Sequence, residues 1–158
     1  ASALYAEGVL GLNPSEPGQL IAKLNEACNE HRRRILALRV NAILPGGEVI
    51  LDNHTEVTVE HIKPRADSDY WRKKFPNKVA RETLTDLLGN YTLVHPLQNR
   101  DADDKPYEFK RKIYFETKFP VHALTRTLEK VSDWNETAAK RRHEMLVDLL
   151  CEDLRIRG

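Results

Sequence analysis

The spacing of hydrophobic and polar positions along the chain predicts a mostly helical protein with a few short strands near its middle. Several segments have apolar residues every three or four positions, which is the period of an amphipathic helix. The expected helices are residues 17–39, 77–88, 104–116, 121–131 and 135–154. Two stretches, residues 57–62 and 91–94, are short and rich in β-branched residues, as strands are.

Local signals refine these boundaries. Asparagine and aspartate are favoured N-caps, so Asn77, Asp103 or Asp104, and Asn135 are expected to begin three of the helices. A turn at Pro45-Gly46-Gly47 separates residues 42–44 from 48–51, and this pattern predicts a hairpin. Residues 1–16 contain turn-forming pairs and are expected to be an irregular lead-in.

Together these elements predict an α+β fold, a mostly helical domain around a small antiparallel sheet. At 158 residues the chain fits a single domain. Within it, residues 1–56 would form a scaffold of helix and hairpin, and residues 118–158 a set of C-terminal helices. Between them, residues 57–117 would form a core of two strands followed by a helix, with a long excursion between the strands.

The charge of the chain is clustered, although its net value is only +1. Basic triplets of this kind are often solvated helix faces, but several in one small domain favour a polyanionic partner. They begin at Arg32, Arg72, Lys110 and Lys140.

The composition also limits the setting in which the protein works. No apolar run approaches the roughly 20 residues of a membrane helix, and no signal peptide is visible, so we expect a cytoplasmic protein without a membrane partner. Cys28 and Cys151 lie in amphipathic patterns and are expected to be buried as small hydrophobic residues. Because the chain has no closely spaced cysteine pair, a structural zinc site is not expected.

The most informative residues surround residue 60. Glu60 and His61 end the first expected strand, shortly before Pro64, and Asn90 and Asn99 follow around the second strand. This order offers a general base, a carboxylate and carboxamides, which phosphodiester hydrolysis with a hard divalent cation requires. Neighbouring strand residues point to opposite faces, so Glu60 and His61 share a site only if the chain bends near Pro64.

These residues make the chain resemble the HNH, or ββα-metal, endonucleases. More closely, it resembles the C-terminal nuclease domain of GmrSD-type modification-dependent restriction and phage-defence proteins. The matching positions are Val59-Glu-His-Ile-x-Pro64, Leu88-Gly-Asn-x-Thr-Leu93, Asn99, Phe109-Lys-Arg111, Tyr114, Trp134 and Arg142.

The resemblance implies a role for each matching residue. His61 would be the general base, Glu60 and Asn99 would hold magnesium or manganese, and Asn90 would position the loop after the histidine. The chain has Glu and Asn where the commonest lettering has Asp and His, and both replacements favour a hard metal over zinc. The resemblance also implies that the chain is the C-terminal part of a longer protein with an N-terminal nucleotide-hydrolysing sensor domain.

Double-stranded foreign or phage DNA is the expected substrate. Lys110 and Arg111 are expected to contact phosphate, because the two cannot both face the core that Phe109 would occupy. Lys63 and Arg100, which are basic neighbours of the site, are also expected to bind nucleic acid. His95 is a competing candidate for the final metal ligand.

Two other functions remain open from the sequence. The chain could be a binding module that grips DNA or a partner without cutting, or an RNase or toxin-like nuclease of the same fold. Tyr70 and Trp71 could stack on bases or pack in the interior.

Overall fold

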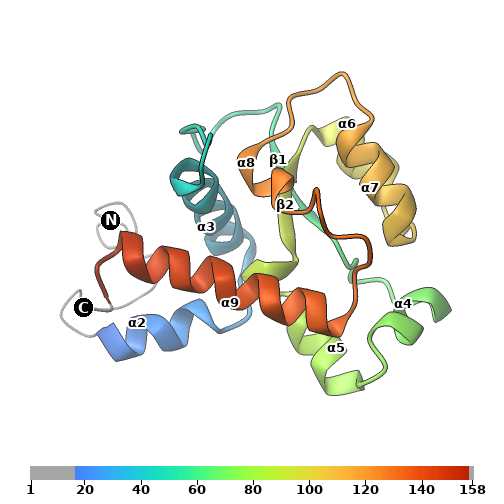
Figure 1. The fold of residues 1–158 in the computed structure, drawn as a ribbon, viewed down its shortest axis with the longest axis horizontal. Coiled ribbons are helices and arrows are strands. Elements are labelled where there is room, and N and C mark those ends of the chain that lie inside the picture. Colours follow the sequence, from blue (N-terminus) through green and yellow to red (C-terminus); the bar gives the residue numbers. More distant parts are fainter. Residues whose placement is uncertain (1–16, 157–158) are drawn as a thin grey trace.

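A two-stranded antiparallel sheet lies at the middle of the molecule, with helices on both sides of it (Figure 1). The structure is a computed structural model that describes residues 17–156, so the expected lead-in at 1–16 lies outside it. The strands are β1 (Thr58–His61) and β2 (Tyr91–Val94), and the short 3-10 helix η1 (Leu88–Asn90) leads directly into β2. The helices are α2 (Pro17–Leu24), α3 (Glu30–Ile43), α4 (Asp69–Lys74), α5 (Lys78–Thr85), α6 (Pro96–Ala102), α7 (Tyr107–Phe115), α8 (Ala123–Arg126) and α9 (Glu136–Asp153).

The expected α+β fold is therefore confirmed, as is the antiparallel pairing of its two central strands. In the register of the sheet, Thr58 lies opposite Val94 and His61 lies opposite Tyr91. Helix α3 contacts both strands, α8 contacts β2, and α6 contacts β1 and packs against α7. Among residues 17–156, no helix combines the length and apolar character that crossing a membrane requires.

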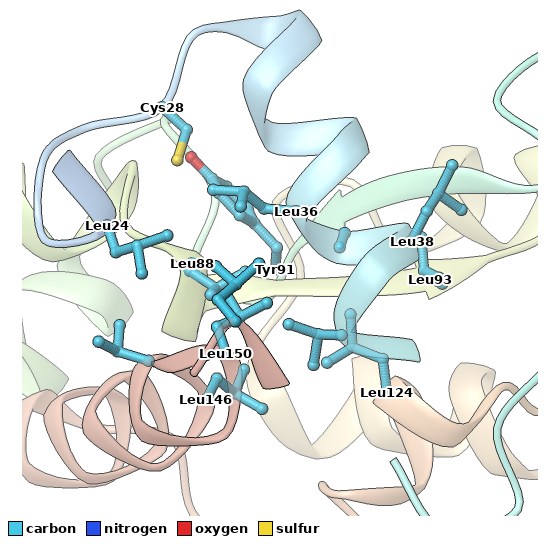
Figure 2. Packing of buried hydrophobic residues seen from close by; sticks show 14 of the residues in the cluster. Leu24, Cys28, Leu36, Leu38, Leu88, Tyr91, Leu93, Leu124, Leu146 and Leu150 are labelled. Carbon is cyan, nitrogen blue, oxygen red and sulfur yellow. The ribbon is translucent and has the colours of Figure 1, made fainter. Parts of the chain in front are cut away.

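Two hydrophobic clusters hold these elements together. The larger one joins α3, η1, β2 and α9, with Leu36, Leu88 and Leu146 fully buried (Figure 2). The smaller one gathers the buried aromatic side chains of the excursion, α7 and the chain before α9. Because successive strand residues point to opposite faces, Leu93 packs in the larger cluster and Val94 in the smaller one. Both cysteines are buried, as expected, and the two form no disulfide.

The single helix expected over residues 17–39 is wrong. The chain leaves the helix after Leu24 and begins α3 at Glu30, where the Asn29 side chain accepts from the Arg32 amide at 2.8 Å. Asn25 also turns its side chain onto the Ile21 carbonyl. Asparagine side chains compete with helical backbone bonds in this way, and they split the apolar pattern into two helices.

The hairpin expected around residues 45–47 is also wrong. Helix α3 extends to Ile43 and so includes most of residues 42–44, the expected first strand of the hairpin. Residues 48–51, the expected second strand, form no strand. Gly46 adopts a φ of 67°, and the Asn41 side chain donates to the Glu48 carbonyl and accepts from the Leu124 amide. A buried asparagine therefore fastens the returning segment in place of a strand partner.

The segment after β2 contains a helix that the hydrophobic pattern did not indicate. His95 caps α6 by accepting from the Leu97 amide, and the Gln98 side chain accepts from the His95 amide in return. Helix α7 begins after Pro106, so neither Asp103 nor Asp104 caps it. The caps expected at Asn77 and Asn135 are present on α5 and α9.

Candidate active site

An open hollow of about 480 Å³ lies at the end of β1. It brings together four of the expected site residues, Glu60, His61, Asn99 and Arg100. Asn99 comes from α6, and its Nδ2 donates to the Val59 carbonyl at 3.2 Å, which fixes the carboxamide beside the strand. The full lining is Arg33, Glu60, His61, Pro64, Arg65, Asn99, Arg100 and Asp103.

Glu60 and His61 reach the same hollow because the strand ends between them and Pro64. His61 is the last residue of β1, and the chain bends at Ile62 and Lys63. Glu60 is buried with 4% of its surface exposed, and His61 is half-buried. The bend expected from Pro64 is therefore confirmed.

The Glu60 carboxylate is held from behind by helix α7. Its Oε1 accepts from Lys110 Nζ at 2.7 Å and from the Tyr114 hydroxyl at 3.1 Å. Burial raises the pKa of Glu60 above its ordinary value, and the Lys110 ammonium acts in the opposite direction. A carboxylate has about four acceptor positions, so these contacts orient Glu60 and leave it able to bind a cation.

His61 has a defined hydrogen-bonding state. Its Nε2 lies 3.2 Å from Asp86 Oδ1, and Arg65 binds the same oxygen at 3.0 Å. An ionised carboxylate only accepts, so Nε2 must carry the hydrogen and Nδ1 is left as the acceptor. Among the described residues, no group donates to that Nδ1.

The environment keeps His61 neutral. The pKa of His61 is lowered to about 4, mainly because the ring is buried; the hydrogen bond to Asp86 opposes this shift, and the charges of Arg33 and Arg65 contribute to it. Tyr91, opposite His61 in the sheet, places its ring edge-on at 5.0 Å. An unprotonated imidazole is therefore present at neutral pH.

Asn90 fastens the loop that follows His61. Its Oδ1 accepts from the Lys63 amide at 2.8 Å and from Trp134 Nε1 at 3.1 Å. Its Nδ2 donates to the carbonyls of Lys63 and Thr85 at 2.8 and 2.9 Å. All four hydrogen-bonding positions of the carboxamide are thus used. Asn90 is 1% exposed, so it positions the loop and does not line the hollow.

Helix α9 supports the same turn from the other side. The buried Arg142 donates from Nη1 to the carbonyls of Gly89 and Tyr91, at 2.6 and 2.8 Å. Burial lowers the pKa of Arg142 to about 10. Backbone on both sides of Asn90 is therefore held by this guanidinium.

Three of the four expected phosphate contacts need correction. Lys110 has no exposed side-chain surface and pairs with Glu60, because the buried face of α7 is Tyr107, Lys110 and Tyr114 while Phe109 is exposed. Lys63 is 3% exposed, and its Nζ donates to the Pro64 carbonyl.

Arg111 also points elsewhere. It donates to the Glu129 carbonyl and lies over the Phe115 ring, outside the lining of the hollow. Arg100 differs from the other three, since its side chain is 72% exposed and borders the hollow.

Some of the remaining candidates lie away from the hollow. His95 caps α6 and stacks on Phe119 with ring centroids 3.9 Å apart. Trp71 is fully buried in the smaller cluster, whereas Tyr70 is only half-buried at its edge.

Sequence reasoning missed Asp86, the partner of His61. It follows α5 directly, 25 residues beyond His61 in the chain. No spacing rule joins the two positions, because the excursion between the strands decides where they meet. Only its place as a polar residue before Leu87 and Leu88 could have drawn attention to it.

The donors at the hollow fit a hard divalent cation. Glu60 offers a carboxylate oxygen, and Asn99 offers its carboxamide oxygen because its nitrogen is already used. In the described part of the chain, no group of three histidine, cysteine, aspartate or glutamate side chains forms a metal cage. Magnesium is commonly bound by one or two carboxylates with water and substrate phosphate, so a sparse donor set of this kind suits it better than zinc.

Comparison with protein-family models gives a match to most of the chain. The family model described as the C-terminal domain of GmrSD restriction endonucleases matches residues 20–149. The match includes the hollow, Asp86 and most of α9. No curated protein and no solved structure matches the chain.

Proposed function

Because the chain belongs to the family of GmrSD restriction endonuclease C-terminal domains, we propose that it is a divalent-metal-dependent HNH endonuclease that hydrolyses DNA. One observation carries the proposal. A neutral His61, the Glu60 carboxylate and the Asn99 carboxamide all line one open hollow. These are the groups that phosphodiester hydrolysis with a hard cation requires.

His61 would take the proton from the attacking water at Nδ1. Its Nε2–H points to Asp86, whose carboxylate would stabilise the imidazolium as it forms. The low pKa of His61 guarantees the neutral form before the reaction. A substrate phosphate brings negative charge into the hollow, so its arrival raises the basicity of His61 at the moment when a base is needed.

Glu60 and Asn99 would hold magnesium or manganese in the hollow. A bound divalent cation would neutralise charge on the phosphate oxygens and on the leaving 3′ oxygen. The contacts of Lys110 and Tyr114 fix the Glu60 carboxylate before any ligand arrives. Arg65 and Arg100 are exposed at the border, where they would face the phosphates that flank the cut.

We further propose that the domain is the cutting part of a restriction or anti-phage system. A nucleotide-hydrolysing sensor domain in the same protein would recognise the foreign DNA. The lining of the hollow is mostly charged, which suits contact with the sugar-phosphate backbone, and such contacts position the nucleic acid without reading its sequence.

A plasmid assay tests the proposal. Supercoiled plasmid is incubated with the chain and Mn²⁺ or Mg²⁺, and relaxed and linear products are separated on a gel. We expect cutting that EDTA stops and that His61→Ala abolishes without loss of thermal stability. DNA binding without any cutting would favour a binding module, and cutting of RNA alone would favour an RNase.

A further inference from the structure

Arg33, from helix α3, lies at the edge of the hollow beside Glu60 and His61. It also borders a smaller cavity of about 110 Å³ on the side of Glu30 and Thr58. Helix α3 lies outside the two strands and helix that carry the nuclease motif, and the motif assigns Arg33 no role. The side chain is half-buried, so part of it remains accessible.

The guanidinium of Arg33 is not neutralised. Its Nε and Nη1 atoms are buried, and neither has a hydrogen-bond partner among the described residues. The next residue contrasts with it, since Arg34 donates to Asp52, to the Val57 carbonyl and to the His54 carbonyl. A buried N–H group without an acceptor costs about 1–3 kcal/mol, so such a group calls for an explanation.

An aromatic ring holds Arg33 in place of a carboxylate. The guanidinium carbon lies 5.6 Å from the centre of the Tyr91 ring, which is within the range of a cation–π contact. Tyr91 in turn contacts His61 edge-on. The side chain is thereby positioned next to the general base, and its Nε and Nη1 atoms have no hydrogen-bond partner among the described residues.

We propose that Arg33 binds a phosphate of the nucleic-acid strand in the hollow, with the part of its guanidinium that borders the hollow donating to the phosphate oxygens. The inference rests on the proposed nuclease function and adds a residue from the N-terminal helices to the site. A guanidinium fork matches the geometry of a phosphate and donates strong, charge-assisted bonds. The positive charge of Arg33 also acts on His61, which agrees with their closeness.

The test measures DNA affinity against salt. The full chain carrying His61→Ala, with Mn²⁺ present, is titrated onto a 30-base-pair duplex at several salt concentrations. Arg33→Met keeps the aliphatic contact with Tyr91 and removes the charge. We expect binding about tenfold weaker and a log–log salt slope shallower by about 0.9, the loss of one phosphate contact.

Two further variants separate this role from packing. Arg32→Met removes the same charge one residue earlier, outside the lining of the hollow, and should leave the affinity and slope within error. Arg33→Lys keeps the charge and should keep the slope while binding more weakly, because it lacks the fork. Because Arg33 forms no salt bridge among the described residues and methionine keeps the aliphatic contact with Tyr91, Arg33→Met should melt within about 2 °C of the parent protein. If it does not fold, Arg33→Lys decides the question.

The outcomes distinguish this inference from the nuclease proposal. A parent slope retained by Arg33→Met overturns the role of Arg33, even if the wild-type chain cuts plasmid. A shallower slope in Arg33→Met, with no cutting by the wild-type chain, supports phosphate binding while the nuclease proposal fails. Equal losses in Arg32→Met and Arg33→Met also overturn the inference, because they would reflect general charge.

Discussion

Gly89 lies directly against His143 of helix α9. The Gly89 amide donates to His143 Nδ1 at 3.2 Å, and a Cβ atom on Gly89 would come within 2.5–2.6 Å of His143 backbone and Cβ atoms. No side chain fits between the two residues. The turn that carries Asn90 is therefore pressed onto α9, and this contact connects the C-terminal helix to the geometry of the hollow.

Replacing Gly89 with alanine should destabilise the protein strongly. The new methyl group meets backbone, which cannot move aside as a flexible side chain could, so we expect a loss of about 2–4 kcal/mol in the free energy of unfolding. Urea unfolding followed by circular dichroism measures it. Gly18→Ala is the matched control, since a Cβ there has nothing within 4 Å, and it should change stability by less than about 1 kcal/mol. Similar values for the two variants would contradict the close contact.

The same contact predicts a dependence of stability on pH. Burial lowers the pKa of His143 from 6.5 to about 4, so between these values the unfolded chain binds a proton that the folded chain does not. Stability should therefore fall as the pH drops from 6.5 to 4, by roughly 3 kcal/mol from this residue. His143→Gln should make this part of the stability curve less steep, with His61 contributing the remaining fall, whereas His54→Gln at an exposed position should leave it unchanged. A curve unchanged by His143→Gln would show that His143 carries no such penalty.

Replacement of Asn90 by alanine should mainly reduce stability, whereas replacement of Asn99 should mainly reduce metal affinity. Asn90→Ala leaves four backbone and indole groups without their partner, so we expect a loss above about 3 kcal/mol in unfolding free energy. Asn99→Ala removes one hydrogen bond from a half-buried residue and should cost less than about 1.5 kcal/mol. Its main effect should be Mn²⁺ affinity, measured by calorimetry. Loss of Mn²⁺ affinity in Asn90→Ala alone would mean that the two roles are exchanged.

Lys110 should behave as a structural partner of Glu60. Lys110→Met leaves the Glu60 carboxylate buried without its counter-charge, which typically costs about 3–5 kcal/mol. Lys112→Met is the control, because it removes the same charge from an exposed position of the same helix. Thermal melts of both variants give the comparison. If Lys110→Met melts like Lys112→Met and only binds DNA more weakly, the original expectation of a phosphate contact is restored.

Asp86→Asn should impair catalysis without loss of metal binding. An asparagine amide can donate to His61 Nε2, which favours the tautomer whose Nδ1 carries the hydrogen and cannot act as a base. We expect cutting at saturating DNA to slow by roughly 10²–10⁴-fold. Calorimetric Mn²⁺ titration provides the second readout. Normal cutting by a folded Asp86→Asn protein would remove Asp86 from the mechanism.

The sequence was most informative where neighbouring residues alone determine the structure. Strand 91–94 and the caps at Asn77 and Asn135 depend on neighbouring residues, and the structure has all three. The closeness of Glu60 and His61 at one hollow was predictable for the same reason, since a strand end and a proline lie within a few residues of them.

The incorrect predictions arise where a polar side chain is buried, or interrupts a helix, at a place where the apolar pattern indicates otherwise. Lys110 is buried because Glu60 neutralises it, so the hydrophobic period of α7 gave the wrong face. Asn29 breaks a helix that the apolar spacing alone would continue. Asp86 and Arg33 were missed because their closeness to His61 depends on tertiary packing, which leaves no trace in local spacing.

The bonds of Asn90 also bear on how this nuclease unit could be reused. Two strands and a helix resemble a unit that could be transferred to another protein. However, the Asn90 carboxamide, which positions the histidine loop, accepts from Trp134, and the carbonyls of the residues on either side of Asn90 accept from Arg142. Both donors come from the last quarter of the chain. A graft of residues 57–117 into another scaffold would therefore carry Glu60, His61, Asn90 and Asn99 but would lack the two donors that hold the histidine loop in its shape.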